Sequence, residues 1–147
     1  WIENLIENRA DLHRSQLERT RELMDKAIPD ALVRSYEHLK DHITLPDPND
    51  RHVVAAAIRC GAAAIITYNL KDFPPSTLEQ YGLEALHPDT FITHQIHLSE
   101  AKVLETAKKH RNRLRSPVKT VEEYLETLRK QSLPQTVLFL RQYSDLI

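Results

Sequence analysis

The chain has 147 residues, of which 41% are hydrophobic, 28% are charged and 6% are aromatic, and its formal net charge at pH 7 is −1. This length suits one domain, or one domain with a short appendage, and it is long enough to bury a hydrophobic core without disulfides. A single cysteine excludes a disulfide framework and a multi-cysteine zinc site, and no apolar run approaches the roughly 18 residues that a membrane span needs. No signal peptide is evident in the sequence, so we expect a protein of the reducing cytoplasm.

The first 33 residues predict two helices and a short strand. Residues 1–9 have helical periodicity, and no Ser, Thr, Asp or Asn precedes them as a cap, so we expect a fragment whose N-terminal part is missing. Ser15–Glu18 has the form of a capping box and predicts a helix over 16–27. Residues 31–33 are a candidate strand. The first helix has one apolar stripe, formed by Trp1, Ile2, Leu5 and Ile6. The side chains that we expect to face inward from the second helix are Leu17, Leu23, Met24 and Ala27.

Helices and short apolar runs alternate in the middle of the chain. A helix is expected over 49–60, with Cys60 as a small core residue at its end. The run 62–67 is continuously apolar and too short for a helix, which indicates a strand buried on both faces, as in a parallel sheet. A short helix from Ser76 to Gly82 and a strand over 83–86 follow. This order predicts an α/β fold with a parallel sheet and right-handed crossovers.

The remainder of the chain predicts helices only. We expect helices over 88–95, 100–115, 120–131 and 134–143. Thr120–Glu123 has the form of a capping box, and Pro134 suits the first position of the last helix. The alternation of strand and helix stops near residues 95–99, where we place a domain boundary.

Two aspartates stand out by their placement. Asp50 is expected in the first turn of the 49–60 helix, on the same face as Val54 and Ile58, although the helix dipole stabilises an Asp there in any protein. Asp72 follows the buried strand 62–67, and ligands of open α/β sheets lie beyond the carboxyl ends of the strands. A turn-forming Asp before Phe73 and two prolines is an equally good interpretation of Asp72. Thr67 and Asn69 belong to the same polar loop.

Carboxylates that converge need a cation or a shared proton. Two like charges about 4 Å apart repel by about 4 kcal/mol at an effective dielectric constant near 20. All-oxygen clusters prefer Mg²⁺ or Mn²⁺ to zinc, and such an ion can activate water and neutralise a phosphate. His94 and His97 are weak zinc candidates, because no H-E-x-x-H pattern and no cysteine partner accompanies them.

Charge is unevenly distributed. Residues 1–100 carry 10 basic and 16 acidic side chains, and residues 101–147 carry 10 basic and 5 acidic ones. The basic tail is a candidate for contact with RNA or with a partner protein, although a solvated helical face gives the same pattern. The candidate contact residues are Lys108, Lys109, Arg111, Arg113 and Arg115.

Residues 45–57, Leu-Pro-Asp-Pro-Asn-Asp-Arg-His-Val-Val-Ala-Ala-Ala, followed by residues 65–74, Ile-Ile-Thr-Tyr-Asn-Leu-Lys-Asp-Phe-Pro, resemble the second half of a PIN domain. More narrowly, the chain resembles VapC-type toxins of toxin–antitoxin pairs that have an additional C-terminal helical segment. The resemblance implies a PIN-like domain with a parallel sheet over 1–95, lacking its N-terminal strand, and a C-terminal helical extension over 96–147.

The resemblance also implies an activity: Mg²⁺- or Mn²⁺-dependent hydrolysis of RNA by a cluster of about four acidic residues. Asp50 and Asp72 match two of these acids and are the implied catalytic residues and metal ligands. Asn69 stands where many relatives have another acid, so Asn69 and Thr67 are candidate ligands or phosphate contacts. The other two acids have no match and are expected before Trp1, so we expect the full-length protein to cleave RNA and this chain by itself to be inactive.

Partners and alternatives follow from the same resemblance. An RNA substrate, a cognate antitoxin and a homodimer are expected. One alternative is a non-catalytic PIN-like module that binds RNA or a partner. Another is a phospho-acceptor domain like that of a response regulator, which is disfavoured because its acceptor Asp ends a strand, whereas Asp50 is expected to begin a helix.

Overall fold

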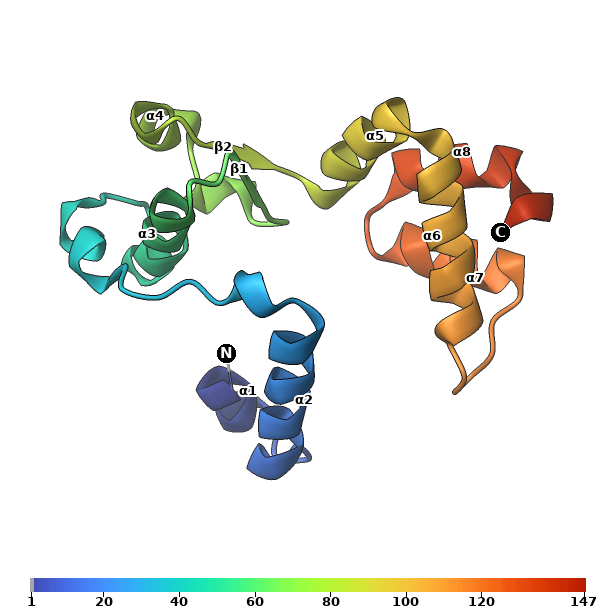
Figure 1. Ribbon diagram of the computed structural model, residues 1–147, viewed down its shortest axis with the longest axis horizontal. Coiled ribbons are helices and arrows are strands. Elements are labelled where there is room, and N and C mark those ends of the chain that lie inside the picture. Colours follow the sequence, from blue (N-terminus) through green and yellow to red (C-terminus); the bar gives the residue numbers. More distant parts are fainter. Residues whose placement is uncertain (1) are drawn as a thin grey trace.

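The computed structural model describes residues 2–147, so Trp1, expected on the first apolar stripe, lies outside the described residues. Figure 1 shows a helical pair at the N-terminus, a central α/β region and a group of C-terminal helices, which succeed one another along the chain. The sheet is parallel, and helices alone follow it, which confirms the predicted fold class. No helix among the described residues has the length and apolar character that crossing a membrane requires.

The N-terminal pair consists of α1 (Ile2–Asn8) and α2 (Arg14–Ala27), which pack against each other. Leu17 is buried as predicted, but Leu23 and Met24 are 56% and 58% exposed, so their predicted inward orientation is wrong. The Ser15 capping box is also wrong, because α2 begins at Arg14 and His13 occupies the cap position.

The predicted strand over 31–33 is absent from this part of the structure. A 3₁₀ turn at Pro29–Ala31 takes its place. Proline fixes its own φ near the helical range and favours such a turn over an extended strand start. The ambiguous segment after it folds as the 3₁₀ helix Glu37–His42, which packs against α3 (Arg51–Cys60).

The central region joins α3 to a two-stranded parallel sheet within the described residues. Strands β1 (Ala64–Ile66) and β2 (Glu84–Leu86) pair in register, with Ala64 opposite Glu84 and Ile66 opposite Leu86. The short helix α4 (Pro75–Leu78) and a 3₁₀ turn connect them. Gly61 and Gly82 have positive φ values of 67° and 66°, which is why each ends its helical segment where the sequence predicts.

One hydrophobic core lies under this region, and its fully buried members include Val54, Ala55 and Leu78. The apolar face of α3 therefore packs against the sheet, and this fixes the N-terminus of α3 next to the carboxyl ends of the strands. Cys60 is exposed, so its expected place in the core is wrong.

A second core lies among the C-terminal helices. These are α5 (Pro88–Leu98), α6 (Glu100–Arg113), α7 (Val121–Lys130) and α8 (Pro134–Gln142). Leu125 and Leu140 are almost completely buried there. The predicted capping box is confirmed: Thr120 accepts a hydrogen bond from the Glu123 amide, and Glu123 accepts one from the Thr120 amide. Ser99 precedes α6 but makes no side-chain cap.

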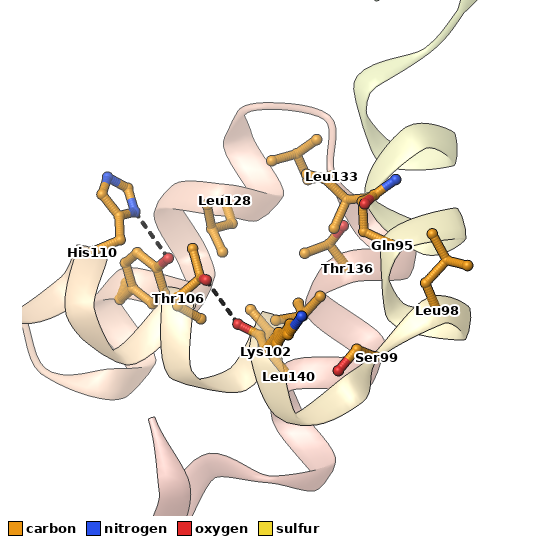
Figure 2. Close-up of a pocket in the computed structure, with 14 residues that line it drawn as sticks. Gln95, Leu98, Ser99, Lys102, Thr106, His110, Leu128, Leu133, Thr136 and Leu140 are labelled. Atoms are coloured by element: carbon orange, nitrogen blue, oxygen red, sulfur yellow. Dashed lines mark hydrogen bonds between the residues drawn. The ribbon is translucent and has the colours of Figure 1, made fainter. Parts of the chain in front are cut away.

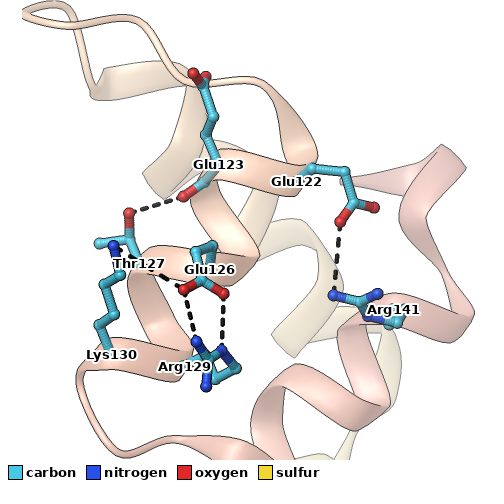
Figure 3. Close-up of polar contacts among 7 residues, drawn as sticks. All are labelled: Glu122, Glu123, Glu126, Thr127, Arg129, Lys130 and Arg141. Atoms are coloured by element: carbon cyan, nitrogen blue, oxygen red, sulfur yellow. Dashed lines mark hydrogen bonds and ion pairs between the residues drawn. The ribbon is translucent and has the colours of Figure 1, made fainter.

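Ion pairs cover the outer surface of α7 (Figure 3). Arg129 donates two hydrogen bonds of 2.7 Å to the carboxylate of Glu126, and Arg141 of α8 lies 3.5 Å from Glu122. These side chains are exposed, so each pair contributes only about 0–1 kcal/mol. The stability of this helical group therefore comes from the second core. Helix α5 runs through the predicted domain boundary at 95 and 96, and that boundary stays a prediction.

Candidate metal centre

Three carboxylates converge at the carboxyl end of β1. Asp47, Asp50 and Asp72 each offer an oxygen atom within 4.8 Å of those of the other two, and all three residues are half-buried. Asp47 and Asp50 lie on the turn that leads into α3, and Asp72 lies on the loop after β1. The structure thus brings together the two aspartates that the sequence singles out and adds a third.

Asp50 occupies a tighter turn than expected. Pro48–Asp50 is a 3₁₀ turn, and Asp50 is the residue at the N-cap of α3 rather than a member of its first turn. It makes no side-chain cap hydrogen bond. Its carboxylate is therefore not committed to the helix amides, and it points into the cluster instead of serving the capping role that any N-terminal Asp can have.

Asp47 is the carboxylate that sequence reasoning missed. Its Oδ1 accepts a 2.8 Å hydrogen bond from the amide of Asn49, which holds the turn closed. One signal was present in the sequence: Asp47 and Asp50 are three residues apart around Pro48, and a 3₁₀ turn places residues i and i+3 on the same side. The two prolines fix the turn that aligns them.

The loop after β1 is organised by Asn69. Its amide nitrogen Nδ2 donates a 2.5 Å hydrogen bond to Oδ2 of Asp72, and its backbone amide donates to Oγ1 of Thr67 at 3.0 Å. The Asn69 side chain therefore orients Asp72, and the Thr67 hydroxyl shapes the loop. Neither observation assigns a ligand role, so their predicted roles as ligands or phosphate contacts stay predictions.

An exposed tyrosine, Tyr68, lies between Thr67 and Asn69 in the sequence. Tyr68 is 57% exposed, and its ring meets the edge of His87 at 5.1 Å between centroids with an interplanar angle of 83°. Nδ1 of His87 in turn accepts a 3.1 Å hydrogen bond from the amide of Asp89. The ring of Tyr68 is thereby supported on one side and accessible on the other.

The donor set fits a hard divalent cation. Three carboxylates this close together concentrate negative charge, which a divalent cation would balance. Mg²⁺ bonds of about 2.1 Å place opposite ligands about 4.2 Å apart, so oxygen atoms within 4.8 Å of one another are near the required spacing. The all-oxygen set excludes a preference for zinc.

The five predicted basic contacts are not equivalent. Lys109 forms a 2.6 Å ion pair with Glu105, and Arg111 donates a 3.0 Å hydrogen bond to the carbonyl of Lys119. Lys108, Arg113 and Arg115 are exposed. Arg111 therefore joins α6 to the loop that leads into α7, which is a structural role. Contact of the five basic residues with RNA or a partner stays a prediction.

The sequence matches two family models. Residues 2–71 match the PIN domain, and residues 88–142 match the VapC50 C-terminal domain. A protein of Mycobacterium tuberculosis (strain H37Rv) named "Putative ribonuclease VapC50" is 53% identical over 51 residues, which are 35% of this chain and 30% of that protein. The chain therefore matches less than a third of that relative's length. No solved structure gives a significant match. The family matches confirm the resemblance that residues 45–74 indicate.

Proposed function

We propose that the chain belongs to a metal-dependent endoribonuclease, the toxin of a toxin–antitoxin pair, because residues 2–71 match the PIN domain model and residues 88–142 match the VapC50 C-terminal domain model. The observation that carries this proposal is the convergence of Asp47, Asp50 and Asp72. A single Asp at a helix N-terminus is common in all proteins. Three carboxylates that meet from two separate loops, and that form no ion pair with a described Lys, Arg or His, favour a bound counterion.

Asp50 and Asp72 are the proposed catalytic residues and metal ligands, with Asp47 as a further ligand. A bound Mg²⁺ or Mn²⁺ would supply an activated water and neutralise charge on the scissile phosphate. Asn69 keeps Asp72 in position through its 2.5 Å hydrogen bond. Because the Asn69 amide donates to Asp72, the opposite Asp72 oxygen stays available to the cluster.

RNA binding is assigned to the surface around this cluster. The exposed ring of Tyr68 offers a flat face on which a single-stranded base can stack, a contact worth about 1–3 kcal/mol. In the C-terminal helical group, away from this cluster, Lys108, Arg113 and Arg115 are exposed cations that offer a second contact surface for phosphates or a partner. The expected partners are an RNA substrate, a cognate antitoxin and a second copy of the protein, all in the cytoplasm.

The test of this proposal is RNA cleavage that requires the metal. The natural full-length protein, freed of cations with EDTA, is incubated with single-stranded RNA and separately supplied with MgCl₂, MnCl₂ or CaCl₂. We expect cleavage with Mg²⁺ or Mn²⁺, its loss when EDTA is returned, and little cleavage with Ca²⁺, because Ca²⁺ accepts looser geometry and longer bonds.

Binding of Mn²⁺ to the present chain is measured in parallel by calorimetry. Metal-independent cleavage would contradict the proposed chemistry. Salt-sensitive RNA binding without cleavage at any metal concentration would favour the alternative of a non-catalytic binding module.

A further inference from the structure

A hollow lies in the C-terminal helical group, away from the acidic cluster. It is a groove of about 690 Å³ lined by residues of α5, α6, α7, α8 and the adjoining turns. Leu98, Val103, Leu128 and Leu133 are among its apolar lining residues. Figure 2 shows the labelled lining residues, Leu98, Leu128 and Leu133 among them, arranged around the groove on different helices and turns. The predicted metal centre uses none of them.

One face of α6 forms the polar side of this groove. Lys102, Thr106 and His110 line it at four-residue intervals, so they form one stripe along the helix. All three residues are exposed. A 3.0 Å hydrogen bond joins Nδ1 of His110 to the hydroxyl of the buried Tyr124, which holds the imidazole at the groove (Figure 2).

Lys102 gives the groove a positive charge. Its lining residues include Lys102 and His110 and no Asp or Glu. The acidic residue nearest in sequence to the middle of the stripe, Glu105, is engaged by Lys109 in a 2.6 Å ion pair. Arg113 follows His110 by three residues and continues the stripe at its end. An occupant that complements this surface is apolar on one side and carries carboxylates along its flank.

The open side of the groove favours an amphipathic helix over a small molecule as the occupant. Sites for small molecules enclose most of the ligand surface, whereas Leu98 is 78% exposed at the rim and the α6 stripe faces solvent. The stripe runs along α6 from Lys102 to His110, so it extends along about 12 Å at about 1.5 Å per residue. An open apolar groove of this length suits an amphipathic helix that inserts side chains at positions i, i+3, i+4 and i+7.

We propose that this groove is the docking site of an acidic amphipathic helix from a partner protein. Aliphatic side chains of the partner fill the space between Val103, Leu128 and Leu133, and its carboxylates meet Lys102 and His110. The site is independent of the metal centre, so docking would recruit or position a partner without needing an occupied acidic cluster.

The experiment uses the full chain and two labelled synthetic peptides of about 16 residues, each about 24 Å long as a helix. Both carry Leu at i, i+3, i+4 and i+7. One has Glu at the flanking positions and the other has Lys. We expect fluorescence anisotropy to show at least roughly tenfold tighter binding of the Glu peptide. Lys102→Glu should weaken that peptide by roughly tenfold and strengthen the Lys peptide, because it reverses the charge of the groove.

Two further variants control this result. Lys26→Glu makes the same change of net charge at an exposed position of α2, outside the groove lining, and should leave both affinities within about twofold. Thr106→Trp places a large ring in the groove from an exposed position and should abolish binding while circular dichroism shows unchanged helicity.

Equal binding of the two peptides, binding of neither, or unchanged affinity in Lys102→Glu would overturn the proposal. Two other results would also overturn it and assign the groove differently. A concentration-dependent dimer that Thr106→Trp dissociates would identify a second copy as the occupant. Saturable binding of decanoate that displaces the Glu peptide would identify a small anionic amphiphile.

Discussion

The carboxylate of Asp89 in α5 accepts two hydrogen bonds from Thr136 in α8, one from its backbone amide at 2.9 Å and one from its hydroxyl at 2.7 Å. The amide of Gln135 donates a third at 2.8 Å. Both Asp89 and Thr136 are buried, at 5% and 4% exposure. Leu133 occupies the cap position of α8 and makes no side-chain cap. Asp89, 46 and 47 residues before Gln135 and Thr136, satisfies the amides of these two residues instead.

We expect Asp89→Asn to lower the free energy of unfolding by about 2 kcal/mol. The variant removes a negative charge from the N-terminus of α8 and turns one acceptor into a donor that faces the buried amides. Urea unfolding followed by circular dichroism measures the loss. Asp145→Asn, an exposed acid near the C-terminus, should stay within about 0.5 kcal/mol of the parent. If the two variants are equally stable, the Asp89 contacts add nothing to the association of α5 and α8.

Local signals in the sequence identified most of the elements in this fold. Gly61, Gly82, Thr120 and Pro134 act within one or two turns of the chain, and their predicted effects are confirmed. The Asp89 contact is different, because Asp89 also looks like an ordinary first-turn acid of α5. Nothing in its neighbourhood indicates a partner in α8. Burial of Leu23 and Met24 likewise depends on what packs against α2, which periodicity along one helix does not specify.

The candidate site likewise combines residues that the sequence predicts with residues that only the structure reveals. The family resemblance and strand order bring Asp50 and Asp72 to one edge of the sheet, and the structure places them there. Asp47 was missed because its Pro-Asp-Pro context is fully explained by a turn. Nothing in that context indicates that the same carboxylate also belongs to the acidic cluster. The groove on α6 was missed because its lining comes from four helices that only packing brings together.

Asp50→Asn in the full-length protein should lower Mg²⁺-dependent RNA cleavage at least tenfold, which corresponds to roughly 1.4 kcal/mol in the activation barrier. The substitution keeps the size of the side chain and removes one charge from the proposed metal site. Initial rates with a fluorescent single-stranded RNA measure the effect. Asp30→Asn, at an exposed turn outside the cluster, is the matched control. Unchanged cleavage by a folded Asp50→Asn protein would remove Asp50 from the catalytic site.

Glu123 makes the stability of α7 depend on pH. Its hydrogen bonds from the backbone amide and the hydroxyl of Thr120 lower the pKa of the Glu123 carboxyl below its usual value. A lowered pKa in the folded state stabilises the protein above the unfolded pKa, near 4.5, and this contribution is lost as the pH falls through the folded value. Glu123→Gln cannot ionise, so we expect the parent to lose more stability than this variant between pH 7 and pH 3 in urea unfolding. Parallel losses in both proteins would show that the capping box does not depend on the charge.

Asp47 has two separable roles, since its Oδ1 accepts the Asn49 amide while the carboxylate joins the acidic cluster. Asp47→Asn keeps an acceptor for the amide and removes the charge, so we expect Mn²⁺ affinity in calorimetry to fall roughly tenfold with little change in Tm. Asp47→Ala removes both roles and should also lower stability by about 1 kcal/mol. If Asp47→Asn binds Mn²⁺ as tightly as the parent chain does, Asp47 serves the turn alone and the metal ligands are Asp50, Asp72 and other groups.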